Sequence, residues 1–358
     1  MTRRLLSSIG ALTTLAAVLA LGAIPLAGQA PTGAKPASAP AKVFTPAKTA
    51  DGQPDLSGYW TNATYTRLER PKGVTKEYYT LEEVVAAEKA AAAVELALSE
   101  PGTPRDVHYD EGQFALTRTQ STFHRNLRTS LILDPPDGRL PPMTAEAQKR
   151  LADLAEARKL RGPRNDMVQN HMVDTRCIIM GGTAPPMLPP GYLSNLQISQ
   201  SPGYVSVIVE RLHDARLIPL DGRPFPSDHL RSWVGVSRGR WQGNTLVVES
   251  RNFNNRRPGV GDGTTAGLVF RGATQDMRVT ERFTPVDANT IRYNFTVEDP
   301  KTWTKPWTAE LDMVRLSPHG PMFEFACHEG NYSMLNMLGI ARLEEKRAAE
   351  AAKKKGSN

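Results

Sequence analysis

Apolar and polar residues alternate with a period of two along the chain from about residue 195 onward. Successive side chains of a β-strand point to opposite faces, so this period predicts strands that bury one face and expose the other. The clearest example is the pair of strands within 277–298, whose apolar faces carry Met277, Val279, Glu281, Phe283, Ile291, Tyr293, Phe295 and Val297. The alternation predicts nine strands in all, at 195–200, 204–211, 215–220, 233–241, 245–251, 277–285, 290–298, 307–316 and 322–328.

Short polar segments separate these strands and predict hairpin connections. They are Gln242-Gly243-Asn244 and the segments 213–214, 286–289 and 317–320, and residues of these types favour tight turns between antiparallel strands. Eight or nine antiparallel strands in succession predict a mainly β protein, built as an up-and-down barrel or a strongly curled sheet around an internal cavity. A β-sandwich with inserted helices is the alternative.

Two helices are predicted ahead of the strands. Thr80 and Glu83 have the spacing of a capping box at the start of the alanine- and glutamate-rich run 81–98. Thr144 is the expected N-cap of a second helix over 145–160. We expect these helices to pack outside the barrel or to cap one of its ends.

The first 30 residues have the layout of a secretory signal peptide. Arg3 and Arg4 precede an apolar run over about 9–26, and small residues end at Ala30, so we expect cleavage near Ala30 and a periplasmic or secreted product. A membrane anchor fits less well, because Pro25 interrupts the run and no stop-transfer charges follow it. No later apolar stretch approaches the roughly 20 residues that span a bilayer, so we expect no integral membrane span after signal removal.

Composition suggests how the rest of the chain is divided. Residues 31–50 are rich in alanine and proline and cannot bury enough surface to offset the entropy of ordering, so a linker is expected there. The predicted parts are the signal peptide 1–30, the linker 31–50, an N-terminal part 51–192 with a short strand, the helices and an irregular segment, the antiparallel barrel 193–343 and a charged tail 344–358.

The positive charge of the chain has no accompanying motif that would indicate a nucleic-acid partner, and the expected compartment argues against one. The chain has 44 Lys and Arg against 37 Asp and Glu, a net charge of +7, and removal of Arg3 and Arg4 with the signal peptide leaves 7 − 2 = +5. Part of this surplus lies in the helix-prone tail 342–355, where a solvated face is the simplest interpretation. No nucleic-acid-binding motif accompanies it, so we expect no nucleic acid among the partners.

Cys177 and Cys327 are the only cysteines. In an oxidising compartment an isolated pair predicts a disulfide, and closing a loop of about 150 residues would stabilise the fold by roughly 4–5 kcal/mol through loop-closure entropy. Two buried or reactive thiols are the alternative, since sequence alone does not bring their Cα atoms within reach of each other.

The run 323–332, FEFACHEGNY, is the strongest candidate for a site. In an extended strand Glu324 and His328 share one face while the phenylalanines take the other. A carboxylate beside an imidazole fixes the tautomer of the ring and moves its pKa, which general acid–base catalysis requires. Glu329 and Asn331 follow at the end of the strand, Glu329 as a further catalytic candidate and Asn331 as a candidate ligand-binding residue. A structural histidine that completes a hydrogen-bond network is the alternative.

A second candidate lies in the hairpin 204–216, YVSVIVERLHDAR. Glu210 near the end of one strand, His213 in the turn and Arg216 at the start of the return strand are expected to converge at one rim of the barrel. We expect Arg216 to hold an oxyanion or a carboxylate. A surface hairpin with a cross-strand ion pair is the alternative.

Aromatic residues suggest a third candidate within 233–245, WVGVSRGRWQGNT. Trp233, Ser237 and Trp241 could line an apolar binding wall, or they could belong to the core.

Residue types and spacing give little support to a metal. The candidate set contains acceptable ligands, but no HxH or HExxH spacing occurs, so we expect neither a metal nor another cofactor, with a divalent ion as the alternative.

Six segments carry a resemblance to known sequences: DGQPDLSGYWTN, TSLILDPPDGRLPP, ERLHDAR, SRGRWQGNTLVVES, VEDPKTWTKPWT and FACHEGNY. With them the chain resembles, over nearly all of residues 50–343, a broad family of secreted bacterial proteins of unknown function. The resemblance implies no reaction, but it supports placing Glu210, His213, Arg216, His328 and Glu329 in one site. The shorter run Gly58-Tyr59-Trp60 resembles the GxW motif of lipocalin-like barrels, although this chain is longer and has a helical front half.

These patterns together predict a periplasmic or secreted barrel that binds a small, partly apolar organic molecule. We favour an enzyme that uses acid–base chemistry, as a lyase, isomerase or hydrolase, with His328 or His213 as the proton carrier and Glu210 or Glu324 as the orienting group or base. A non-catalytic ligand-binding or envelope protein is the alternative.

Overall fold

The computed structural model describes residues 44–98, 102, 125–160, 167–190, 193–254, 273–316 and 322–356. The predicted signal peptide and most of the predicted linker lie outside this part of the chain. Among the described residues, no helix is long and apolar enough to cross a membrane.

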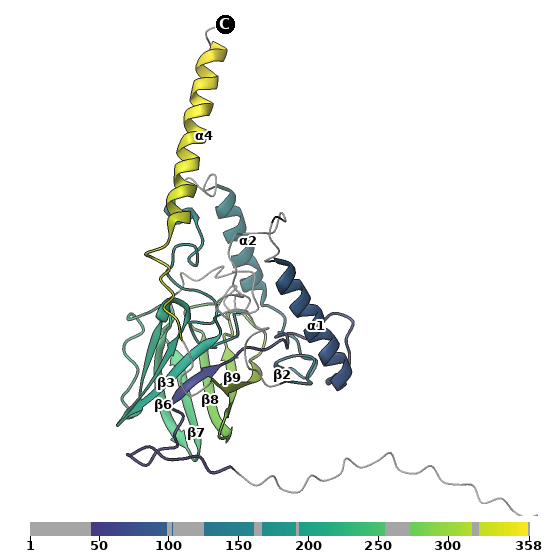
Figure 1. The fold of residues 1–358 in the computed structure, drawn as a ribbon. Coiled ribbons are helices and arrows are strands. Elements are labelled where there is room, and N and C mark those ends of the chain that lie inside the picture. The colour runs from purple at the N-terminus through teal and green to yellow at the C-terminus, as the bar shows by residue number, and fades with distance from the viewer. Residues whose placement is uncertain are drawn as a thin grey trace, which may run out of the picture. The chain divides into compact units, whose positions relative to one another are not determined.

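The described strands form one antiparallel sheet that curls into a nearly closed barrel (Figure 1). The order of neighbours is β5-β4-β3-β1-β10-β9-β8-β7-β6, and β2 pairs with β10 off this path. The prediction of a mainly β, barrel-like fold is confirmed. The strands are β1 (Gly58–Thr61), β2 (Ile132–Asp134), β3 (Asn195–Ser201), β4 (Tyr204–Val209), β5 (Ala215–Pro219), β6 (Val236–Gln242), β7 (Thr245–Arg251), β8 (Arg278–Asp287), β9 (Thr290–Glu298) and β10 (Trp307–Arg315).

The two end strands of the sheet, β5 and β6, approach each other at Gly239. A Cβ atom at this position would lie 2.8 Å from Cγ2 of Ile218 and 2.7 Å from Cδ2 of Leu220, both of which belong to β5 or follow it directly. Only glycine permits this approach, because every other residue would bring a Cβ into the side chains opposite. Gly239 therefore forms the seam at which the sheet closes.

Both predicted helices are present with the predicted bounds, and their caps explain why they begin where they do. In α1 (Leu81–Leu98) the Glu83 carboxylate accepts the Thr80 N–H at 2.8 Å, and the Thr80 hydroxyl accepts the Glu83 N–H at 3.3 Å, which is the reciprocal capping box. In α2 (Ala145–Leu160) the Thr144 hydroxyl accepts the Ala147 N–H at 3.1 Å. A third helix, α4 (Tyr332–Gly356), contains the predicted helix-prone tail and begins ten residues before it.

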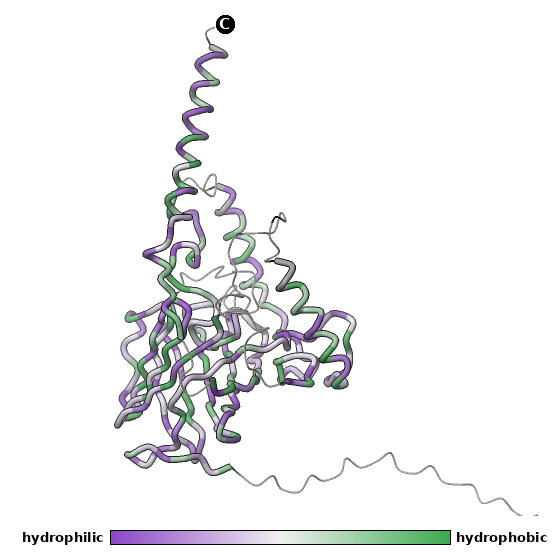
Figure 2. The backbone as a smooth tube through the Cα atoms, viewed as in Figure 1, coloured by the Kyte–Doolittle hydropathy of each residue, from purple (hydrophilic) through white to green (hydrophobic). Residues whose placement is uncertain are grey.

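The period of two places an aromatic row inside the barrel. Phe283, Tyr293, Phe295 and Trp307 come from β8, β9 and β10, and consecutive ring centroids in this row are 5.0, 5.4 and 5.7 Å apart. All four side chains are fully buried. Hydrophobic and hydrophilic residues alternate along the strands in Figure 2, as expected for a sheet with one wet face.

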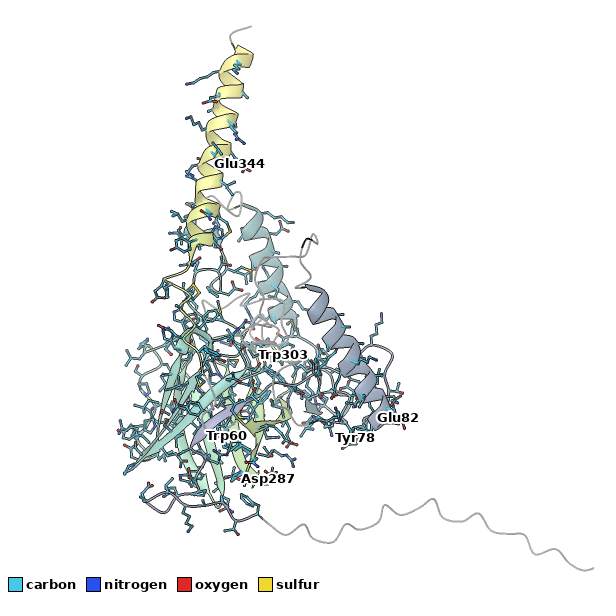
Figure 3. The ribbon with its side chains drawn as sticks, in the orientation of Figure 1. Trp60, Tyr78, Glu82, Asp287, Trp303 and Glu344 are labelled. Carbon is cyan, nitrogen blue, oxygen red and sulfur yellow. A yellow bond between two sulfur atoms is a disulfide. The ribbon has the colours of Figure 1, made fainter. Side chains whose placement is uncertain are left out.

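The two ends of the barrel are built differently. At one end tight turns join β3 to β4, β6 to β7 and β8 to β9, and Figure 3 labels Asp287 there. At the other end the longer connections leave the sheet after β1, β4, β7 and β9, and Figure 3 labels Trp303 near it. We refer to this second end as the loop-covered end. Binding residues are commonly carried by long connections on a rigid scaffold, so this end is the natural place for a site.

A buried segment, residues 181–188, fills the barrel from the loop-covered end, and we call it the plug. The Met187 N–H donates to the Tyr293 hydroxyl at 2.9 Å, and the Met187 carbonyl accepts the Asn62 side-chain amide at 2.8 Å. The Gly181 carbonyl accepts a guanidinium N–H of Arg211 at 3.1 Å. The plug and the buried side chains around it thus occupy interior space in which the sequence predicted a cavity.

Two expectations about the strands need correction. The predicted strand 322–328 is not a strand, because the described residues from 322 onward form an extended segment without a strand partner and then a turn before α4. The sheet also includes β1 and β2, which precede residue 193, so strands on both sides of that predicted boundary share one barrel. β2 was not predicted, since three residues are too few to establish a period.

Candidate functional site

Glu210 lies at the loop-covered end, directly after β4, and is almost completely buried. Its backbone N–H donates to the Asn195 carbonyl at 3.0 Å, and its Oε1 accepts the Phe323 N–H at 2.9 Å. The second carboxylate oxygen, Oε2, is buried and accepts no hydrogen bond within the described part of the chain. Burial raises the pKa of Glu210 above its ordinary value, and the hydrogen bonds with Phe323 and Asn195 oppose that rise only partly.

The disulfide predicted from the isolated cysteine pair is confirmed. Cys177 and Cys327 are bonded, with their Cα atoms 5.8 Å apart. Asn331 reinforces the same junction, because its side-chain amide donates to the Thr175 carbonyl at 2.9 Å. Its Oδ1 also accepts the Met334 N–H at 3.2 Å and so caps α4. Asn331 therefore anchors the helix, whereas the sequence suggested a ligand-binding role for it.

The structure brings two of the predicted groups together. Through Glu210 and the disulfide, the ERLHDAR turn and the FACHEGNY segment meet at the loop-covered end. The imidazoles of His213 and His328 are both on exposed residues, and so are the carboxylates of Glu324 and Glu329. Strand alternation was expected to place the side chains of Glu324 and His328 on one face. Because the segment is not a strand, that argument does not apply to them.

Arg216 is separated from this group. Its guanidinium points into the barrel and forms a two-pronged ion pair with Glu281, at 2.7 Å from Nη1 to Oε2 and 3.1 Å from Nη2 to Oε1. The Tyr293 hydroxyl donates to Glu281 Oε1 at 2.7 Å, and Arg216 Nη2 lies 3.5 Å from the Met187 sulfur of the plug. The expected convergence of Arg216 with His213 at the rim is therefore wrong, because the side chain turns to a carboxylate inside the barrel.

Electrostatics explain why Arg216 keeps its charge inside the barrel. Burial disfavours the cation of Arg216, but the adjacent Glu281 carboxylate outweighs it and raises the pKa of Arg216. Burial and the same carboxylate hold the pKa of Tyr293 well above its ordinary value, so the phenol remains a donor. The sequence did contain a signal for this cluster, since Glu281 and Tyr293 interrupt the apolar faces of two alternating strands.

The predicted aromatic wall belongs to the body of the barrel. Ser237 is buried and shares a 2.8 Å hydrogen bond with Ser250 on the neighbouring strand. Trp233 and Trp241 are partly buried and pack against the hydrophobic core. The sequence allowed these tryptophans to line a binding wall or to belong to the core, and their positions favour the core.

A polar hollow of about 500 Å³ opens at the loop-covered end, beside the last residues of β7 and β9 and the first of β8. We call it the arginine–carboxylate hollow. Its charged lining residues are Asp228, Arg231, Arg251, Asp276, Arg278 and Glu298.

Only some of these charges are matched by a neighbour. Arg251 pairs with Glu249 at 2.8 Å, and Asp276 pairs with Lys301 at 2.6 Å. The side chains of Asp228, Arg278 and Glu298 have no hydrogen bond or ion pair with any described residue. The hollow therefore offers both signs of charge to a molecule that enters it.

A groove of about 540 Å³ adjoins the hollow and shares Gln275 and Asp276 with it. One wall is a face of α2 that carries Arg150, Leu154 and Ala157. Sequence reasoning missed both spaces because their linings come from segments far apart in the chain, none of which carries a motif.

No group of three or more His, Cys, Asp or Glu residues within the described ranges is placed to hold a metal ion.

Comparison of the chain with protein-family models, with curated proteins and with solved structures gives no significant match.

Proposed function

We propose that the protein binds a small, charged organic molecule in the arginine–carboxylate hollow. The observation that carries the proposal is a space of about 500 Å³ whose lining includes Asp228, Arg278 and Glu298, none of which forms a hydrogen bond or ion pair with a described side chain, although Arg278 and Glu298 lie opposite each other on β8 and β9. Binding sites for small molecules have volumes in this range and use a few converging polar groups to orient the ligand.

The lining specifies the chemistry of the ligand. Guanidinium groups match the geometry of carboxylates and phosphates, so Arg231, Arg251 and Arg278 favour an anionic group. Asp228 and Glu298 favour an amine or hydroxyl donor. A molecule that carries both kinds of group fits better than the partly apolar molecule expected from the sequence.

The proposal includes export of the protein from the cytoplasm. A signal peptide over residues 1–30, cleaved near Ala30, would deliver the protein to the periplasm or the medium. The Cys177–Cys327 disulfide supports this compartment, because such bonds persist in oxidising environments.

Acid–base catalysis on the bound molecule is the second candidate, and Glu210 favours it. A buried carboxyl group with a raised pKa and one unbonded oxygen lies at the same end of the barrel, and the tethered segment beside it carries His328. As a lyase, isomerase or hydrolase, the protein would use Glu210 as the acid or base. Without such a role for Glu210, the protein is a ligand-binding or envelope protein.

Native mass spectrometry of the exported full-length chain, exposed to a small-molecule extract of the producing cells, tests the binding proposal. We expect the wild type to retain a small molecule and the Arg278→Gln and Glu298→Gln variants to lose it. Arg240→Gln is the matched control, because Arg240 is exposed on β6 outside the hollow lining. Equal retention by all variants would place the ligand elsewhere, and an empty wild-type protein would reject binding.

The identified molecule then tests catalysis. A product that accumulates with the wild type and not with Glu210→Gln, at equal retention of the ligand, supports the enzyme. Retention without any product supports the binding protein.

A further inference from the structure

A cavity of about 150 Å³, open to solvent on one side, lies beneath α1, away from both spaces at the loop-covered end, with which it shares no lining residue. Its lining comes from α1, from residues 64–67 and from residues 126–129, with Pro71 and Tyr79 between them. Figure 3 labels Tyr78, just before α1, and Glu82 in the first turn of the helix, and Val84 lines the cavity from this end of α1.

One face of α1 forms the apolar wall. The helix contributes Val84, Ala87, Glu88 and Ala91, whose spacing of three and four residues places them on the same side. Val84 is buried, Ala91 is partly buried and Ala87 is exposed, and the short alanine side chains leave space between the helix and the segments opposite. The wall is therefore apolar, with a single carboxylate on it.

The volume suits a single ring. A cavity of about 150 Å³ in another protein is known to admit benzene, so a six-membered ring fits this space, and a substituent on the ring can extend toward the open side. The Tyr79 side chain and the alanine wall are suitable neighbours for such a ring.

The charged side chains around the cavity favour an anionic ligand. Glu88 already pairs with Arg125, from Arg125 Nη2 to Glu88 Oε2 at 2.9 Å. Arg67 lines the cavity, is exposed, and makes no side-chain hydrogen bond or ion pair with any described residue. It is thus a guanidinium at the solvent side of the cavity that no carboxylate of the described chain neutralises.

Arg128 adds a second donor. Its Nη1 binds the Glu77 carboxylate at 2.8 Å and the Tyr78 hydroxyl at 3.1 Å, but its Nε is buried and has no hydrogen-bond partner within the described residues. A buried N–H without an acceptor is destabilising, and an acceptor on a ligand would remove that cost.

We propose that this cavity binds a single-ring aromatic carboxylate. The ring lies against Val84, Ala87 and Ala91, and the carboxylate meets the guanidinium groups of Arg67 and Arg128. The site is independent of the arginine–carboxylate hollow, so a molecule bound in one leaves the other available.

Calorimetric titration of the exported full-length protein with benzoate tests the proposal. We expect one benzoate per chain, and binding of benzamide that is weaker by at least about tenfold, because benzamide has the same shape without the charge. Arg67→Gln should weaken benzoate binding to a similar degree, and Arg240→Gln, at an exposed arginine of β6 outside the lining, should not.

A pair of leucine substitutions tests the location of the ring. Ala91→Leu fills the cavity and should abolish binding, whereas Ala86→Leu introduces the same side chain on an exposed residue of α1 outside the lining and should preserve it. Thermal unfolding of each variant shows whether it is folded. If Ala91→Leu does not fold, the effect of Arg67→Gln on benzoate binding decides whether benzoate binds in this cavity.

Three outcomes would overturn the proposal. They are no benzoate binding to the wild type up to about 10 mM, equal binding of benzamide and benzoate, and benzoate binding that folded Ala91→Leu or Arg67→Gln leaves unchanged.

Discussion

Arg216 and Glu281 are charged residues that the barrel keeps out of water, with 3% and 0% of their side chains exposed. Removing two charges from water costs several kcal/mol each, which the ion pair and the Tyr293 hydrogen bond must offset. Such a pair adds little net stability, but the loss of one partner leaves the other buried and uncompensated. This asymmetry makes the pair testable.

Arg216→Met should lower the free energy of unfolding by about 3–5 kcal/mol, because Glu281 is then a buried carboxylate without its cation. Arg216→Met combined with Glu281→Gln should recover most of that loss, since no charge remains to be desolvated and the glutamine side-chain carbonyl can still accept the Tyr293 hydroxyl. Denaturant unfolding of the single and double variants measures both values. A double variant as unstable as the single one would show that the loss came from packing and not from charge.

Glu210 gives a pH dependence whose sign follows from burial. The unfolded chain releases this proton near the ordinary value of 4.5, and the folded chain holds it to a higher pH, because burial raises the pKa. The raised pKa therefore contributes stability below pH 4.5 that is lost as the pH rises through the folded value. Glu210→Gln stays uncharged and can still accept the Phe323 N–H.

We expect the wild type to lose stability relative to Glu210→Gln as the pH rises from 4.5, and the difference to level off above the folded pKa. Denaturant unfolding of both proteins, from about pH 4 to about pH 8, measures the difference. A constant difference over that range would mean that Glu210 ionises as it does in the unfolded chain.

At the scale of elements, helices whose caps lie next to them in the sequence could be predicted. Segments whose conformation depends on contacts with distant residues could not. The Thr80–Glu83 capping box and the Thr144 cap lie next to the helices they start, so α1 and α2 could be located from the sequence. The alternation in FEFACHEGNY predicted a strand, but a strand also needs a neighbour with which to pair. Glu210 and the disulfide hold this segment in its place, and neither contact is visible in a local pattern.

Loss of the disulfide should destabilise the fold and release this segment. The bond spans 150 residues. Because loop-closure entropy is lost, the free energy of unfolding of the Cys177→Ser, Cys327→Ser double variant should be about 4–5 kcal/mol lower than that of the wild type. Segment 322–331 would then be held through Glu210 and Asn331, and limited proteolysis should remove α4 sooner. Reduction of the wild type should give the same change. Equal stability and equal cleavage rates in both proteins would contradict it.

At the scale of the whole molecule, alternation predicted the curled antiparallel sheet, because the period of two is a local property of each strand. It did not predict the arginine–carboxylate hollow, whose lining joins Asp228, Arg251, Asp276 and Glu298. These residues meet only because the order of strands brings the ends of β7, β8 and β9 to the same end of the barrel. These residues are candidates for ligand binding because of where the fold places them, and their residue types alone did not single them out.

Closure of the barrel depends on how closely β5 and β6 approach, and Gly239 tests it. The methyl groups of Gly239→Val would extend beyond a Cβ that already lies 2.7 Å from Leu220 and 2.8 Å from Ile218. The clash should lower the free energy of unfolding by roughly 1–3 kcal/mol, although valine favours strands. If these two strands close the sheet, hydrogen exchange should accelerate first in β5 and β6.

Gly339→Ala is the matched control for Gly239→Val. Gly339 lies within α4 and has no atom within 4 Å of its potential Cβ, so alanine there should be neutral or stabilise the helix by about 0.5–1 kcal/mol. Unchanged stability and exchange in Gly239→Val, beside a normal control, would mean that β5 and β6 do not touch in solution. The sheet would then be open at this edge, and β5 and β6, which are not hydrogen-bonded to each other in the order of strands, would be accessible for pairing with another chain.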